Sequence, residues 1–282
     1  MSNQPLIVLS ERLAQAYQRA CLAEIEALKP GNVHIFADGH GMRVQDFISS
    51  AEASSSVIAQ SELALGERIY RSVEATWTAV NCNTNLGIIL LCAPIIQAAL
   101  MPNANNLRNQ LAAVMANTTY ADATWLFKAI QKANPAGLGR ANKHDINHAV
   151  DCNLQQAMSA AAQKDLIAQQ YANGFWHIFE QGLPCFEAAL LRWQRPAWAV
   201  TALYLFWLSH YPDSHIARKY GLAVAQKIQD EALEHHHAFQ VLDNPKHYLT
   251  PLLTFDASLK SRAINPGTSA DLTVATLLLH GI

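Results

Sequence analysis

The chain has 282 residues, of which 51% are hydrophobic and only 15% charged, enough apolar material for one large core or two small ones. Its 20 Lys and Arg residues balance 22 Asp and Glu residues, which argues against a general nucleic-acid-binding surface. The most apolar run, residues 86–100, is too short to cross a bilayer, and the start of the chain lacks a secretory signal pattern. The five cysteines form no CxxC pair. We therefore expect a cytoplasmic protein that uses neither nucleic acid, nor a membrane, nor zinc.

Apolar residues recur at helical spacing along nearly the whole chain. The segments predicted as helices are 10–28, 44–62, 65–79, 85–100, 104–116, 120–132, 145–162, 164–181, 184–193, 196–210, 214–240 and 269–279. TYAD (119–122) and TSAD (268–271) are typical of capping boxes at helix starts. No segment alternates apolar and polar residues as a strand does. The sequence predicts a single compact all-α domain over residues 1–282 with about ten to twelve helices, although a division into two subdomains stays open.

Glu24 lies within the apolar stripe of the first predicted helix. A carboxylate in that position costs several kcal/mol unless it is paired or bound to a metal. A structural ion pair with Lys29 or His34 and a role in a functional site are both open.

The loop over residues 29–42 combines glycines, which let the backbone approach a ligand closely, with groups that bind anions or metals. The glycines are Gly31, Gly39 and Gly41, and the charged or metal-capable groups are Lys29, His34, Asp38 and His40. Ordinary turns account for the same composition, so the loop is either a binding loop or a simple connection.

Four amide or hydroxyl side chains crowd the start of the helix predicted from residue 85: Asn81, Asn83, Thr84 and Asn85. A single cap would be enough, and the free N–H groups at a helix start favour binding of phosphate. Surplus caps in a polar turn are the alternative.

Residues 143–153 carry a mixed acidic and histidine pattern, with His144, Asp145, His148, Asp151 and Asn153. Oxygen-rich side chains of this kind favour a magnesium site over a zinc site. A solvated polar helix face is the competing interpretation.

The stretch PDSHIARKYG (212–221) follows a very apolar run, and Asp213 or Ser214 caps the helix that begins there. His215, Arg218 and Lys219 share one face of that helix. Because the helix dipole disfavours cations near its start, the cluster indicates a buried anion in front of this face.

Two further motifs lie near the C-terminus. The histidines of EHHH (234–237) point in different directions on a helix, so we interpret them as a solvated surface. NPGTSADL (265–272) brings Asp271 to a helix start, where Thr268 is the predicted cap. The motif serves either as that cap alone or as a site that pairs free N–H groups with a carboxylate.

Five motifs in order resemble the triphosphoribosyl-dephospho-CoA synthase family, over about residues 12–279: KPGNVH, NTNLG, HD…DCN, PDSHIARKYG and NPGTSADL. The resemblance implies an all-helical, cytoplasmic transferase that uses ATP. In this family the 5-triphosphoribosyl group of ATP moves to the 2′-hydroxyl of 3′-dephospho-CoA and adenine leaves. The product is the prosthetic-group precursor of acyl-carrier proteins that take part in citrate or malonate decarboxylation.

The chain departs from the family pattern where Asn85 and Leu86 replace a His-Lys pair, and where Cys152 replaces the threonine of Asp-Thr-Asn. It is more similar to a divergent branch found in archaea and in bacteria with methanopterin-type cofactors. Alternative functions are therefore a transferase or phosphate-handling enzyme of methanopterin-type cofactor biosynthesis, and a non-catalytic nucleotide-binding protein.

The residues and the resemblance together predict the following roles. The catalytic candidates are Glu24, Asp145 and Asp271, and the ligands of Mg²⁺ are Asp145, Asp151 and Asp271. The nucleotide- and phosphate-binding candidates are Lys29, Gly31, Asn32, Asn83, Thr84, Asn85, His215, Arg218, Lys219, Thr268 and Ser269. The expected partners are small nucleotide substrates, and the apolar content is compatible with a homodimer.

Overall fold

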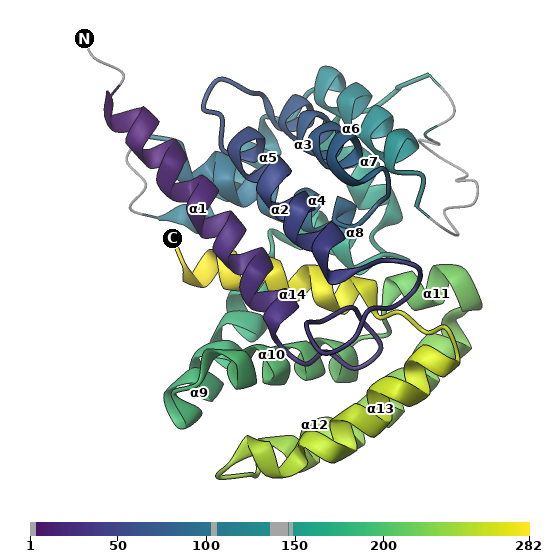
Figure 1. Cartoon of the computed structure of the whole chain (residues 1–282). Coiled ribbons are helices and arrows are strands. Elements are labelled where there is room, and N and C mark those ends of the chain that lie inside the picture. Colours follow the sequence, from purple (N-terminus) through teal and green to yellow (C-terminus); the bar gives the residue numbers. More distant parts are fainter. Residues whose placement is uncertain (1–3, 103–105, 136–145, 147–148) are drawn as a thin grey trace.

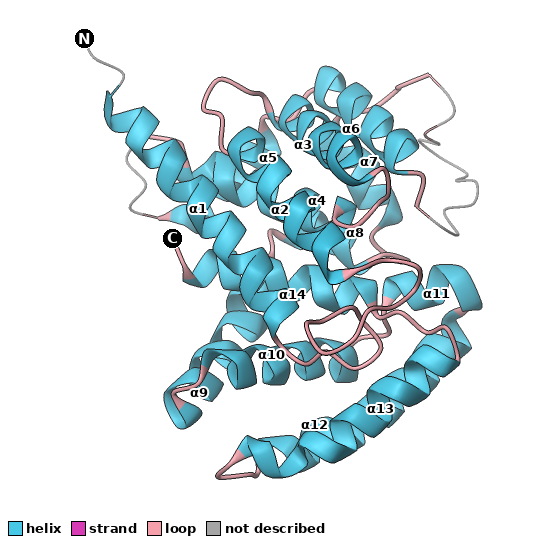
Figure 2. Cartoon of the chain, viewed as in Figure 1, coloured by secondary structure: helices cyan, strands magenta, loops and turns pink. Residues whose placement is uncertain are grey.

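The structure is a computed structural model that describes residues 4–102, 106–135, 146 and 149–282. Helices form nearly all of the regular structure in these residues, which contain no β-strand beyond two isolated bridges in the loop after the first helix (Figure 2). The prediction of an all-α fold is confirmed. The described residues form fourteen α-helices, slightly more than the ten to twelve expected.

The helices are α1 (Gln4–Glu26), α2 (Val44–Ile58), α3 (Leu65–Val80), α4 (Leu86–Ala99), α5 (Leu107–Ala116), α6 (Tyr120–Ala133), α7 (Leu154–Ala161), α8 (Leu166–Asn173), α9 (Leu183–Trp193), α10 (Pro196–His210), α11 (Ser214–Tyr220), α12 (Leu222–Gln240), α13 (Leu249–Ser261) and α14 (Gly267–His280). A π-helical turn precedes α9 and a 3₁₀ turn precedes α13.

The helices α4 and α14 are the core of the fold. Both are apolar on nearly all sides and almost entirely buried, as expected of helices surrounded by other helices. They contact each other, and α14 also contacts α1, α10 and α11. In Figure 1, α14 crosses the middle of the molecule, with α2 to α8 on one side and α9, α10, α12 and α13 on the other. Gly87 at the start of α4 lies against Asp271 near the start of α14, so the two helix N-termini are close together.

Several predicted boundaries differ from the structure. The helix expected over 145–162 begins only at Leu154, and the one expected over 164–181 ends at Asn173. The helix predicted over 214–240 is two helices, because Gly221 has φ +91°, a conformation that interrupts an α-helix and favours glycine. The sequence pattern does not predict α13, because Pro245 and Pro251 make its start resemble a loop; both prolines are tolerated in the first turns of helical segments.

One of the two predicted capping boxes forms. Thr119 and Asp122 cap α6 as expected, and Asp122 also accepts a hydrogen bond from the Gly66 N–H at 2.8 Å. The second prediction is wrong, because α14 begins at Gly267 and Thr268 already lies in its first turn. Its hydroxyl instead accepts from the His215 N–H at 3.1 Å.

The prediction of a solvated EHHH surface is wrong for His236, which is 2% exposed. It faces α10, where its ring lies edge-on to His210 with centroids 5.1 Å apart. Helix α12 packs along α10, so that one histidine in the run must turn inward. Burial, and the nearby His210 and His237, lower the pKa of His236 to about 4.

None of the described helices combines the length and apolar composition needed to span a bilayer.

Candidate active site

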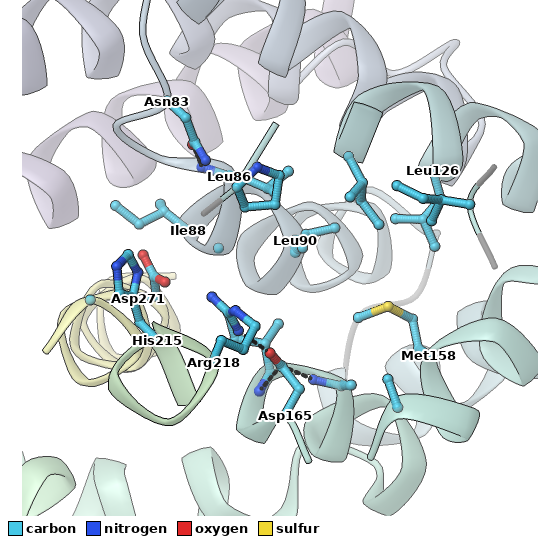
Figure 3. Close-up of a pocket in the computed structure, with 18 of the residues that line it drawn as sticks. Asn83, Leu86, Ile88, Leu90, Leu126, Met158, Asp165, His215, Arg218 and Asp271 are labelled. Carbon is cyan, nitrogen blue, oxygen red and sulfur yellow. Dashed lines mark hydrogen bonds and ion pairs between the residues drawn. The ribbon is translucent and has the colours of Figure 1, made fainter. Parts of the chain in front are cut away.

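A cleft of about 1280 Å³ lies beside the starts of α4 and α14 (Figure 3). Single-ligand pockets in proteins typically range from about 300 to 1,000 Å³, so this cleft has room for two nucleotide-sized molecules. One half of it is polar and contains Glu24, Asn32, His215, Arg218 and Asp271. The other half is lined mainly by apolar side chains.

Helix starts surround the polar half of the cleft. Gly87 in the first turn of α4, Asp165 at the cap of α8 and Gly267 at the start of α14 all line it. The first N–H groups of a helix lack partners within the helix and carry partial positive charge. At α8 and α14 several of these N–H groups already donate to Asp165 and Asp213, so it is the helix dipoles that favour an anionic ligand here.

Asp271 projects from the second turn of α14 toward the start of α4 (Figure 3). Its carboxylate lies so close to Gly87 that a Cβ at that position would be 2.0 Å from Oδ2. Desolvation raises the pKa of Asp271 well above its usual range, and the negative charges of Asp213 and Glu24 raise it further. Asp271 is partly exposed and lines the cleft, and none of the described residues hydrogen-bonds to its carboxylate, which leaves the carboxylate accessible to a ligand.

Glu24 lies in the wall of the cleft and forms an ion pair with Lys29, as one of the two sequence-based interpretations predicted. Lys29 is 0% exposed and also donates to Asn32 Oδ1 at 3.1 Å. Asn32 in turn donates to Asn265 Oδ1 at 2.8 Å. Burial raises the pKa of Glu24, while Lys29 opposes this shift. The network fixes one carboxylate and two amides along the same wall.

The anion predicted in front of α11 is a carboxylate of the protein. Arg218 forms an ion pair with Asp165, whose other oxygen caps α8 through the N–H groups of Ile167 and Ala168. Because α11 ends at Tyr220, Arg218 lies in its last turn, where the dipole favours a cation. The position that looked unfavourable in the sequence is therefore electrostatically favourable.

Asp213 joins α11 to α14. One oxygen caps α11 through the N–H groups of His215 and Ile216, and the other accepts from the N–H and hydroxyl of Ser269 at 2.8 and 2.9 Å. Asp213 is 1% exposed. This bridge places His215 beside Gly267 at the cleft. Burial lowers the pKa of His215. Asp213 opposes this shift and the positive charges of Arg218 and Lys219 add to it, so the neutral imidazole is favoured.

The structure brings about half of the predicted site residues to the cleft. Those lining it are Glu24, Asn32, Asn83, Thr84, Asp151, His215, Arg218 and Asp271. Asp145 lies outside the described residues, as do His144 and His148 of the same motif. In the part of the chain that is described, no three His, Cys, Asp or Glu side chains come together as a preformed metal site.

The other predicted binding residues lie outside the lining of the cleft. Lys29, Asn85, Thr268 and Ser269 are buried supports, and Lys219 is exposed beside the ring of Tyr220. The Gly31 N–H donates to Asp256 Oδ1 at 2.8 Å, which ties the KPG loop to α13.

Several lining residues were not predicted as site residues, among them Gly87, Asp165 and Asn265. Gly87 and Asn265 belong to motifs quoted from the sequence, and Asp165 lies near the start of a predicted helix. Asp165 precedes an apolar run, where a carboxylate is indistinguishable from a simple helix cap. Gly87 gave no signal of its own, because its role depends on Asp271, which is far away in the sequence.

The sequence pattern of the ATP:dephospho-CoA triphosphoribosyl transferase family matches residues 10–282. The chain belongs to this family. The expected resemblance and the prediction of an ATP-dependent transferase are thereby confirmed, and ATP is a substrate of the family.

The fold is similar to a crystal structure of a proposed triphosphoribosyl-dephospho-CoA synthase from Archaeoglobus fulgidus. The TM-score is 0.62 at 23% sequence identity, and the similarity covers 84% of this chain and 97% of that one. At this identity the comparison supports the fold. No curated protein matches the chain.

Proposed function

We propose that the cleft transfers the 5-triphosphoribosyl group of ATP to a hydroxyl of dephospho-CoA, with release of adenine. The observation that carries this proposal is Asp271, a partly exposed carboxylate at the edge of a two-substrate cleft, with a raised pKa and no hydrogen-bond partner among the described residues. A carboxylate with a raised pKa suits a general base near neutral pH.

In the proposed reaction the acceptor oxygen attacks C1′ of the ribose of ATP, and the bond from C1′ to N9 of adenine breaks. Asp271 takes the hydroxyl proton, and adenine leaves with the electron pair of the broken bond and gains a proton. The ribose carbon is oxocarbenium-like in such transfers, so a nearby negative charge stabilises it. Glu24, fixed by Lys29, is the carboxylate that we assign to this role.

Arg218, His215 and the helix starts are the proposed triphosphate-binding groups. Arg218 uses one nitrogen on Asp165, and its Nε has no partner among the described residues, which leaves donors for phosphate oxygens. The neutral imidazole of His215 adds a donor without adding charge. Asn83 and Thr84 stand at the start of α4 on the same cleft.

The charge of the cleft supports binding of the triphosphate together with Mg²⁺. The described lining residues include four carboxylates (Glu24, Asp151, Asp165, Asp271) and two permanent cations (Lys164, Arg218). Lys29 behind the wall neutralises Glu24, and a triphosphate would add negative charge that the two lining cations do not balance, so a magnesium ion would supply the compensating charge. Magnesium is commonly held by one or two carboxylates and substrate phosphates, which fits a cleft without a preformed cage in the described residues. With Asp271 taking the proton, Asp151 would hold the ion.

The test is mass-spectrometric detection of adenine after incubation of the protein with ATP, Mg²⁺ and dephospho-CoA. We expect adenine together with a triphosphoribosyl adduct of the acceptor. Asp271→Asn should abolish most of the adenine signal, whereas Asp230→Asn, on the exposed side of α12, should preserve it.

The alternatives predicted from the sequence are separate outcomes of this assay. Adenine release with a pterin-type acceptor, and none with dephospho-CoA, would assign the protein to another cofactor pathway. Binding of ATP without release of adenine in the presence of any acceptor would indicate a non-catalytic protein. Either result would overturn the proposal.

A further inference from the structure

The second half of the cleft is apolar. Its walls come from α4, α6 and α7, and we define this apolar half by the residues Leu90, Leu126, Phe127, Ile130 and Met158. Figure 3 shows Leu126 and Met158 on the opposite side of the cleft from His215 and Asp271. An apolar wall of this kind favours a ligand that brings hydrocarbon groups to it.

Polar side chains lie along the same region. Asn134 ends α6, Ser159 is adjacent to Met158 on α7, and Gln163 follows that helix; all three line the cleft. A ligand that alternates methylene groups with amides would match this combination, because its amides would find partners while its hydrocarbon covers the wall.

The position of the apolar half decides which part of the substrates it suits. Arg218 and Asp165 lie between Asp271 and the apolar side chains in Figure 3. The adenine base of ATP is bonded directly to the reacting C1′, so it stays beside Asp271. The triphosphate is charged and is therefore disfavoured against a hydrocarbon wall. What remains is a group joined to the acceptor nucleotide through a long linker. Dephospho-CoA is adenosine diphosphate with such a group, the pantetheine arm, which carries two methyl groups, methylenes, two amides and a thiol.

We propose that the apolar half of the cleft binds the non-nucleotide arm of the acceptor, and that Leu126 and Met158 select acceptors with a flexible, largely apolar arm. This inference rests on the proposed function, because it takes the acceptor hydroxyl to lie at Asp271. It assigns a specificity role to residues that otherwise have the character of ordinary core.

The test compares acceptors that share the adenosine hydroxyls and differ in the arm: dephospho-CoA, ADP-ribose with a polar arm, and ADP with none. For the unmodified protein we expect kcat/KM for dephospho-CoA to exceed the other two values by at least about tenfold. Equal use of ADP and dephospho-CoA would overturn the inference.

Two variants locate the effect. Ala161→Trp places a large ring at an exposed lining position, and Met158→Gln keeps the length of the side chain but makes it polar. Both should raise KM for dephospho-CoA about tenfold and leave KM for ATP and the slow use of ADP unchanged. Ala112→Trp, at an exposed position of α5 outside the lining, is the matched control and should behave as the unmodified protein. If Ala161→Trp raised KM for ATP as much as KM for the acceptor, that result would contradict the proposal.

Failure of the proposed function is distinguishable from failure of this inference. If no acceptor leads to release of adenine, the proposed reaction fails. The inference is then tested by calorimetry, which compares the affinities of the protein for dephospho-CoA and ADP. Tighter binding of dephospho-CoA that Ala161→Trp weakens would support the arm site. Equal affinity for the two compounds, including no binding of either, would overturn it.

Discussion

Gly87→Ala probes the placement of the carboxylate that the proposed chemistry needs. The added Cβ would lie 2.0 Å from Asp271 Oδ2 and 2.8 Å from a methyl group of Ile167. Ordinary contact begins at 3.4 Å, so the carboxylate must move by about 1.4 Å or α4 must shift away from α14. A displacement of about 1 Å in a reacting group costs on the order of 10²-fold in rate.

Stability should change much less than activity. Alanine is favoured over glycine in a helix by about 1 kcal/mol, which offsets part of the crowding. If the two effects leave a net change of about 1 kcal/mol in the free energy of unfolding, Tm shifts by about 2–4 °C. Gly281→Ala is the control, because its Cβ would have its nearest neighbour at 3.4 Å. We expect kcat/KM for adenine release to fall about 10²-fold in Gly87→Ala and to stay unchanged in Gly281→Ala.

The double variant tests whether the effect passes through Asp271. In the Asp271→Asn background the carboxylate base is already lost, so Gly87→Ala should cost little more, a strong departure from additivity. The reasoning would be refuted if Gly87→Ala kept turnover within about threefold of the unmodified protein. It would be refuted equally if the two substitutions multiplied their effects.

Asp271, Arg218 and Asp213 each have a further measurable effect. Since desolvation raises the pKa of Asp271, kcat/KM should rise with pH over a range above the ordinary carboxyl pKa. The free energy of unfolding should fall over the same pH range, because the folded state keeps the proton longer than the unfolded state does. Asp271→Asn should remove the first trend in pH-rate profiles and the second in urea titrations. Arg218→Lys should raise KM for ATP at least about tenfold in steady-state assays, because the ammonium group of lysine cannot bind two phosphate oxygens as the planar guanidinium does. An unchanged KM would exclude contact between Arg218 and the phosphates. Asp213→Ala should lower the free energy of unfolding by about 3–4 kcal/mol in urea, through loss of a cap and of the bridge to Ser269; a loss below about 1 kcal/mol would contradict this bridging role.

The sequence predicted the fold class and the polar half of the cleft because both leave local signals. Helical periodicity is strong wherever one face packs on the core, and most of the predicted helices exist. Glu24 was conspicuous in an apolar stripe, and Asp271 and Arg218 were conspicuous beside helix starts. A charged residue in a chain with few charges indicates a site.

The remaining features depend on contacts between distant segments. Asp213 and Ser269 are 56 positions apart, and nothing local distinguishes a serine that braces a helix from one that binds phosphate. Thr268, Ser269 and Lys29, which the sequence predicts as ligand-binding residues, are buried and lie outside the lining of the cleft. The apolar half gave no signal either, since Leu126 and Met158 have the spacing of core residues.

Four carboxylates in or near the cleft differ in how they are hydrogen-bonded, and this difference supports the proposed role of Asp271. Asp213 accepts four hydrogen bonds, Glu24 is paired with Lys29, and Asp165 holds both Arg218 and the start of α8. Asp271 has no hydrogen-bond partner within the described residues, yet glycine at position 87 leaves space for it against α4. Asp271 is partly exposed and lines the cleft, so its carboxylate is accessible to a substrate. Asp213, Glu24 and Asp165 are held by their partners, and this contrast supports the proposed role of Asp271 as the group that exchanges a proton with a substrate.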